Sequence, residues 1–177
     1  MEKTKIDYAL LIETFRQYDT EECGILSYSQ YEELTKSMNI CENNSDYVKI
    51  AYKALCTIYK NVEIGINFEN VRLIYESAST KIKTKLNSLI LFRGVDDDRD
   101  GRIDSHQFKR IALLVNSSLT DCQINQLFQK CSPDEKETVS YSHVARKVFH
   151  VSMTLDEDPY SMKLMKYSHL SNTCLLI

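Results

Sequence analysis

Apolar side chains recur along this chain with the spacing of half-buried helices. In most segments they lie three and four residues apart, so that they gather on one face of a helix with 3.6 residues per turn. The polar stretches between these segments are short. The pattern predicts helices near residues 5–18, 28–38, 46–58, 68–78, 82–95, 105–115, 121–130 and 141–150. We therefore predict an all-α fold.

Four aliphatic residues in the turns between paired helices are almost evenly spaced. They are Leu26, Ile66, Ile103 and Val139, which lie 40, 37 and 36 residues apart. Each is the eighth residue of a twelve-residue turn, and these turns are residues 19–30, 59–70, 96–107 and 132–143. Apolar residues also flank each turn at matching positions, and such a repeat indicates repeated structural units. The alternative is a helical bundle with one chance acidic turn.

The third turn has the composition of a loop that wraps a hard cation. Calcium is bound by oxygen atoms from alternate loop residues, and the loop turns sharply at its sixth position. Carboxylates occupy positions 1, 3, 5 and 9, which are Asp96, Asp98, Asp100 and Asp104. Gly101 stands at position 6, where a residue without a Cβ adopts the required backbone conformation at little cost. The backbone carbonyl of Arg102 would supply position 7.

This loop resembles the calcium loop of the EF-hand family, which includes calmodulin and calcineurin B-like sensors. The family pattern D-x-[DN]-x-[DN]-G-x5-E ends on a glutamate, whereas this chain has Gln107. An amide gives one neutral oxygen in place of two charged ones. We therefore expect weaker calcium binding and a smaller preference for calcium over magnesium. The resemblance implies these metal ligands: Asp96, Asp98, Asp100, Arg102, Asp104 and Gln107. Magnesium, or an acidic turn without a metal, is the alternative.

The other three turns lack a comparable set of oxygen ligands. The first has Cys23 at position 5, and a thiol is a poor ligand for a hard cation. The second has Ile64 where the glycine belongs, and the fourth has Lys136 at position 5. We expect these turns to be kept as structural partners, with or without a bound ion, because a lone helix–loop–helix cannot bury its apolar face. Each would pair with a neighbour through its eighth residue.

Pairing of this kind predicts two short antiparallel ribbons, with Leu26 beside Ile66 and Ile103 beside Val139. The resemblance then implies four EF-hand-like helix–loop–helix units arranged as two paired lobes. Residues 1–78 would form a pair with degenerate loops, and residues 79–152 a pair that contains the metal loop. Residues 153–177 would form a C-terminal tail.

Composition narrows the class of function. The 177 residues are 43% hydrophobic and 27% charged with a net charge of −3, so no basic surface for nucleic acid is expected. The longest apolar run near the middle of the chain is far too short to span a bilayer. The six cysteines show no C-x-x-C spacing and are expected to be reduced. No nucleophile elbow, zinc motif or phosphate-binding loop is present, so we expect a protein that is not an enzyme.

The last four residues, Cys174 to Ile177, fit the C-a-a-X prenylation pattern. We expect Cys174 to be the lipidated residue, and the alternative is that the apolar tail docks into a groove of the protein itself. One prenyl chain gives only marginal, reversible membrane binding. The expected location is cytoplasmic, with peripheral membrane association through that group.

The resemblance implies a calcium sensor for signalling that exposes an apolar groove to an amphipathic helix of a partner protein. The candidate groove residues, for which lobe core is the simpler account, are Leu91, Phe92, Phe108, Ile111, Leu127, Phe128 and Val144. The alternative function is a calcium-independent adaptor with a structural or magnesium-filled third loop.

Overall fold

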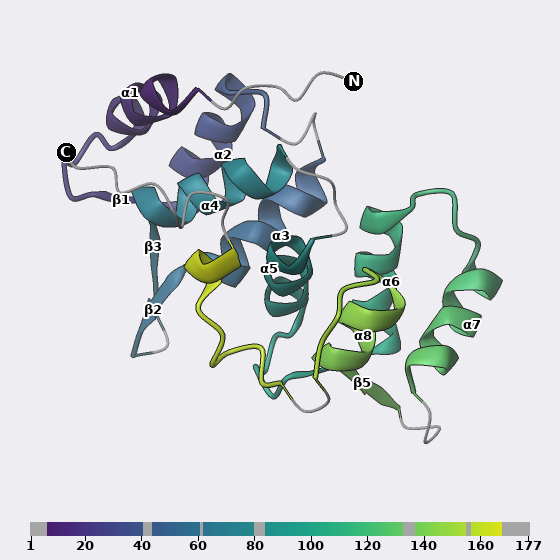
Figure 1. Ribbon diagram of the computed structural model, residues 1–177. Coiled ribbons are helices and arrows are strands. Elements are labelled where there is room, and N and C mark those ends of the chain that lie inside the picture. Colours follow the sequence, from purple (N-terminus) through teal and green to yellow (C-terminus); the bar gives the residue numbers. More distant parts are fainter. Residues whose placement is uncertain are drawn as a thin grey trace. The chain divides into compact units, whose positions relative to one another are not determined.

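The computed structural model describes residues 7–40, 44–60, 62–79, 84–132, 137–154 and 157–167. Over these residues the chain forms eight α-helices, five strands and one short 3-10 helix (Figure 1). It divides into two units, Met1–Lys81 and Ile82–Ile177.

The first unit combines helices with an antiparallel sheet whose strand order is β1-β3-β2. In chain order its elements are α1 (Tyr8–Tyr18), β1 (Ile25–Leu26), α2 (Tyr28–Ser37), α3 (Ser45–Leu55), β2 (Thr57–Tyr59), β3 (Val62–Asn67) and α4 (Phe68–Ala78). Each helix begins after an Asp, Asn or Ser whose side chain accepts a backbone N–H of the first turn, which stabilises the helix start. Each helix contributes fully buried side chains to the core, among them Leu11, Leu34, Ile50 and Ile74.

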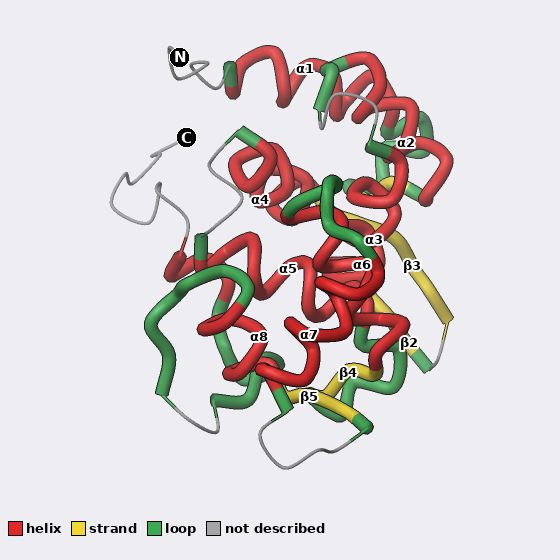
Figure 2. The backbone as a smooth tube through the Cα atoms, turned by 90° about the vertical axis from the view of Figure 1, so that its right-hand side faces the viewer, coloured by secondary structure: helices red, strands yellow, loops and turns green. Residues whose placement is uncertain are grey.

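The second unit carries the acidic loop between its first helix and its first strand. In chain order its elements are α5 (Lys85–Val95), β4 (Arg102–Asp104), α6 (Ser105–Val115), α7 (Asp121–Cys131), β5 (Thr138–Ser140), α8 (Tyr141–Lys147) and η1 (Leu164–Tyr167). Figure 2 shows β4 and β5 side by side, and they pair antiparallel. Helix α5 is buried on nearly every side and contacts α6, α8 and η1.

The two predicted pairings are confirmed. Leu26 lies opposite Ile66, and Ile103 lies opposite Val139. All four side chains are at most 1% exposed, so each short ribbon closes over a hydrophobic core. The eight helices also lie where the hydrophobic spacing predicted them, with ends shifted by a few residues.

The predicted fold class, an all-α set of four EF-hand-like units in paired lobes, is wrong. The structure contains two sheets, and β2 and β3 form a ribbon where the second turn was expected. The helix predicted over 46–58 ends at Leu55. The residues that follow are mostly β-branched or aromatic, which favours extended backbone. We predicted a helix through residue 58 because Leu55 and Ile58 have helical spacing.

Gly65 permits the close approach of β1 to β3. Its φ is +134°, and a Cβ at this position would meet the backbone oxygen of Leu26 and lie 2.6 Å from Cγ2 of Ile25. Gly24 also has a positive φ, of +75°, but a Cβ there would meet no atom within 4 Å. Adding a Cβ at Gly65 therefore causes both a steric clash and backbone strain, whereas adding one at Gly24 causes backbone strain alone.

We predict that Gly65→Ala lowers the free energy of unfolding of the first unit by about 2–4 kcal/mol, because strain and overpacking add. Gly24→Ala is the control and should cost about 1 kcal/mol. Urea denaturation followed by circular dichroism measures both. Equal losses would contradict the tight packing of β3 against β1.

Candidate metal centre

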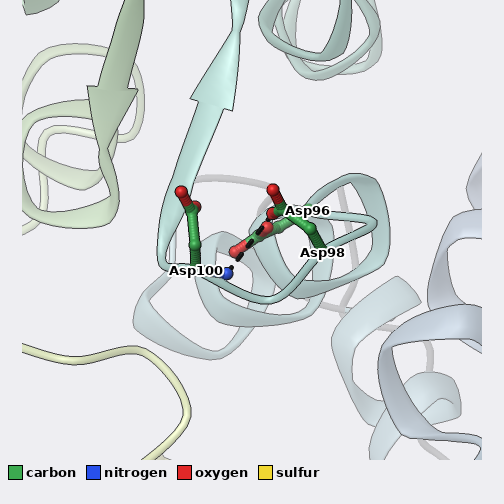
Figure 3. A group of neighbouring side chains, drawn as sticks. All are labelled: Asp96, Asp98 and Asp100. Carbon is green, nitrogen blue, oxygen red and sulfur yellow. Dashed lines mark hydrogen bonds between the residues drawn. The ribbon is translucent and has the colours of Figure 1, made fainter.

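The acidic loop is held at both ends by regular structure. Asp96 is the C-cap of α5, and its N–H donates to the carbonyl of Phe92. The loop then leads into β4, which pairs with β5. Its carboxylates Asp96, Asp98 and Asp100 come together so that one oxygen of each lies within 4.8 Å of the others (Figure 3).

Backbone N–H groups of the loop orient these carboxylates. The N–H of Gly101, where φ is +79°, donates to Oδ2 of Asp96 at 2.9 Å. The N–H of Arg102 donates to Oδ1 of Asp100 at 2.7 Å. A longer contact of 3.4 Å joins the N–H of Asp100 to Oδ1 of Asp98. The turn thus holds three carboxylates close together although their charges repel.

One oxygen of this cluster is buried without a donor. Asp96 is only 2% exposed, and its Oδ1 has no hydrogen-bond partner. Burial raises the pKa of Asp96 to about 6; a hydrogen bond from Tyr160 opposes this rise, while the neighbouring Asp98 and Asp100 add to it. An acceptor that is buried next to other acceptors costs free energy unless a proton or a cation lies between them. The arrangement therefore suits a hard cation with oxygen ligands.

The first turn shows the same frame without this unpaired oxygen. Asp19 accepts the N–H of Cys23 on Oδ1 at 3.1 Å and the N–H of Gly24 on Oδ2 at 2.8 Å. Both of its carboxylate oxygens therefore have donors, and among the described residues Asp19 belongs to no group of three or more side chains that could hold a metal ion. In the first turn the aspartate is therefore fully hydrogen-bonded, whereas in the acidic loop one buried aspartate oxygen has no donor.

The remaining predicted ligands have other contacts. The guanidinium of Arg102 donates to Oγ1 and to the carbonyl of Thr138, both at 2.8 Å, and so joins β4 to β5. Asp104 and Gln107 form a capping box at the start of α6: Oδ1 of Asp104 accepts the N–H of Gln107, and Oε1 of Gln107 accepts the N–H of Asp104. The described acidic group comprises Asp96, Asp98 and Asp100 but not Asp104.

Two other predicted features fall partly or wholly outside the described residues. Cys174, the predicted lipidation site, lies outside them, so its modification stays a prediction. Part of the fourth turn does as well, including Lys136. The described part of that turn contains a hydrogen bond of 2.8 Å between the hydroxyl of Ser140 and Nδ1 of His143.

Sequence reasoning missed Tyr160. Its hydroxyl donates to Oδ2 of Asp96 at 3.0 Å, although the two residues are 64 positions apart. Tyr160 belongs to the segment that we predicted as a tail beyond the paired helices. Neither spacing nor composition marks this contact, so no signal in the sequence could have found it.

Comparison with known proteins adds no family. No protein-family model matches the chain, and no curated protein matches it. A solved structure described as "Chaetomium theromophilum TREX2 CID domain complex" is similar at a TM-score of 0.32 and 16% identity, over 80% of this chain and 90% of that one. A likeness this weak supports no inference about fold or function. Among the described residues, no helix is long and apolar enough to cross a membrane.

We predict that Asp96→Asn stabilises the metal-free protein at pH 7. The amide oxygen can accept the bonds from Gly101 and Tyr160, while the new N–H2 group faces Asp98 as a donor. A pKa raised from 3.8 to about 6 corresponds to a gain of at most about 3 kcal/mol.

This gain should depend on pH. Because the folded pKa exceeds the unfolded one, the contribution of Asp96 to stability is full below about pH 4 and is lost as the pH rises through 6. Thermal unfolding in chelator at pH 4 and pH 7 should therefore show the gain of Asp96→Asn only at pH 7. Asp19→Asn is the matched control and should not stabilise, because both oxygens of Asp19 accept N–H groups.

Proposed function

We propose that this protein binds calcium at residues 96–107, in a loop of the EF-hand type, and that the bound ion regulates its binding to a partner protein. The observation that carries this proposal is the buried carboxylate of Asp96, which belongs to a group of three carboxylates and whose Oδ1 has no hydrogen-bond partner. Here a free divalent cation fits the donor set.

The proposed ion would be held first by Asp96, Asp98 and Asp100. The backbone carbonyl of Arg102, the carboxylate of Asp104 and the amide oxygen of Gln107 are the further ligands that the loop sequence predicts. Calcium takes six to eight oxygen ligands, whereas magnesium needs near-ideal octahedral geometry and keeps several waters. Because calcium tolerates irregular coordination by several carboxylates, this loop favours calcium over magnesium. The neutral Gln107 would give a lower affinity than a glutamate at the same position.

Regulation would act through the helices that flank the loop. Helix α5 ends at the first ligand, and α6 begins directly after Asp104. Of the predicted groove residues, five are fully buried in this structure: Leu91, Phe92, Phe108, Ile111 and Val144. Leu127 and Phe128 on α7 are half-buried. A change in the angle between α5 and α6 would uncover part of this apolar surface for a partner helix.

We propose that this activity is cytoplasmic. All four described cysteines, Cys23, Cys56, Cys122 and Cys131, are free thiols, which supports a reducing compartment. The proposed role is binding rather than catalysis. Lipid attachment at Cys174 is a separate prediction, and no step of the proposed regulation depends on it.

Calorimetric titration with calcium and with magnesium tests the proposal directly. A sensor should bind one calcium ion per chain, and the binding of an apolar dye should change in parallel. Asp98→Asn, which removes one exposed carboxylate of the group, should weaken calcium binding strongly. A protein that binds no divalent ion and shows no dye response would instead be an adaptor that holds its partner independently of calcium.

We predict that Gln107→Glu tightens calcium binding by about tenfold or more, because it adds a charged ligand. Glutamate also suits a capping box, so the start of α6 should be unchanged. Gln30→Glu is the matched control, because Gln30 forms the same capping box with Ser27 in the first turn. That variant should not change calcium binding. If Gln107→Glu leaves the calorimetric affinity unaltered, position 12 of the loop has been assigned to the wrong residue.

A further inference from the structure

The described segment after α8 returns across α5 to the acidic loop. We call residues 157–167 the strap. In Figure 1 this segment, coloured yellow, runs to η1, which contacts α5. Leu164 of η1 is 8% exposed, and Pro159 is also buried. The strap therefore packs as part of the second unit and does not trail from it.

Arg93 on α5 binds the middle of the strap. Its Nε donates to the carbonyl oxygen of Pro159 at 2.9 Å, and its Nη2 donates to the carbonyl oxygens of Pro159 and Met162. Its guanidinium carbon also lies 5.7 Å from the ring centre of Tyr160. One half-buried cationic group thus binds two backbone carbonyls and one aromatic face.

Lys85 binds both ends of the strap. Its Nζ lies 3.3 Å from Oε2 of Glu157 and 4.7 Å from the ring centre of Tyr167. Lys85 and Arg93 stand at opposite ends of α5. The strap is consequently attached along the length of this helix.

Tyr160 brings the strap into contact with the proposed metal site. Its hydroxyl donates to Oδ2 of Asp96 at 3.0 Å, on the same oxygen that accepts the N–H of Gly101. The neighbouring Pro159 lies over the turn, 3.5 Å from where a Cβ on Gly101 would stand. Burial, and then the nearby Asp96, raise the pKa of Tyr160, so its hydroxyl keeps its proton at neutral pH.

Both donors bind Oδ2 of Asp96, and Oδ1 of the same carboxylate is left buried without a hydrogen-bond partner. Groups that hydrogen-bond to a metal ligand fix its orientation and affect metal affinity by 10- to 100-fold in typical sites. We infer that Tyr160 is a positioning residue of the metal site and that ion binding and docking of the strap stabilise each other. This inference rests on the proposed function, because it requires an ion at the loop.

The two effects must be equal in size. An ion on Oδ1 holds the Asp96 carboxylate in the orientation that Tyr160 recognises, and the docked strap holds the same carboxylate ready for the ion. By thermodynamic linkage, the factor by which the strap raises calcium affinity is the factor by which calcium favours the docked strap. Docking of the strap, which lies outside the loop, therefore depends on whether the loop holds calcium.

We predict that Tyr160→Phe weakens calcium binding about tenfold in calorimetric titration of the full chain with calcium alone. The substitution removes only the hydroxyl and keeps the ring against Arg93. Tyr167→Phe is the matched control, because it makes the same change in the same strap at a ring that lies over Lys85. Its calcium affinity should equal that of the unaltered protein.

Hydrogen exchange of the strap amides supplies the second measurement. Calcium should slow exchange over residues 157–167 in the unaltered protein and in Tyr167→Phe, but not in Tyr160→Phe. A residue that only supported the fold would change exchange equally with and without calcium. Should Tyr160→Phe fail to fold by circular dichroism, Arg93→Lys loosens the strap without touching Asp96 and should also weaken calcium binding.

The outcomes separate this inference from the proposed function. An unaltered protein that binds no calcium overturns both. An unaltered protein that binds calcium, together with a Tyr160→Phe variant of equal affinity and equal calcium-dependent protection, overturns the inference and leaves the proposed function in place. Reduced affinity in Tyr160→Phe alone, with loss of calcium-dependent protection, supports the linkage.

Discussion

The carboxylate of Asp96 is buried at the end of α5, and this burial constrains the whole second unit. A buried carboxylate is costly in free energy unless donors or a cation surround it. The structure supplies two donors to Oδ2, from the turn at Gly101 and from the strap at Tyr160, and none to Oδ1. A protein that needed only a hydrogen-bonded turn here could use the arrangement of Asp19, whose two oxygens both accept N–H groups.

The ribbon of β4 and β5 is the second requirement of the site. Ile103 and Val139 are buried opposite one another, so the residue that follows the turn is held in the core. Arg102 adds side-chain bonds to Thr138 on the adjacent strand. Since α5 holds one end of the loop and the ribbon holds the other, the fold itself brings the three carboxylates together. In the proposed site, this preorganisation would offset the weaker ligand that Gln107 provides.

Hydrophobic periodicity was sufficient to predict the helices, and even spacing was sufficient to predict that Leu26 pairs with Ile66 and Ile103 with Val139. These features depend on side chains that repeat, and repeats are visible in one sequence. The ribbon of β2 and β3 was missed because short apolar stretches satisfy helical and extended spacing alike. The carboxylate group of the acidic loop was predicted from composition, but the capping role of Gln107 was not.

The strap was missed for a different reason. Arg93 recognises backbone carbonyls of Pro159 and Met162, and backbone carbonyls carry no sequence signal. The contact between Tyr160 and Asp96 joins residues far apart in the chain, so it becomes visible only after the fold is known. Contacts of this kind are the ones that distinguish a particular metal site from other loops with the same ligand pattern.

The strap also limits where a partner helix could bind in the second unit. It contacts α5 through η1, so a partner on that face of α5 would have to displace the strap. Away from η1, Phe108 on α6 packs edge-on against Phe128 on α7, with ring centres 5.3 Å apart, and Phe128 is only half-buried. Because α6 follows the loop directly, a rotation of α6 would change the contact between these rings. Under the proposed function, a partner that bound between α6 and α7 would not have to displace the contact between η1 and α5.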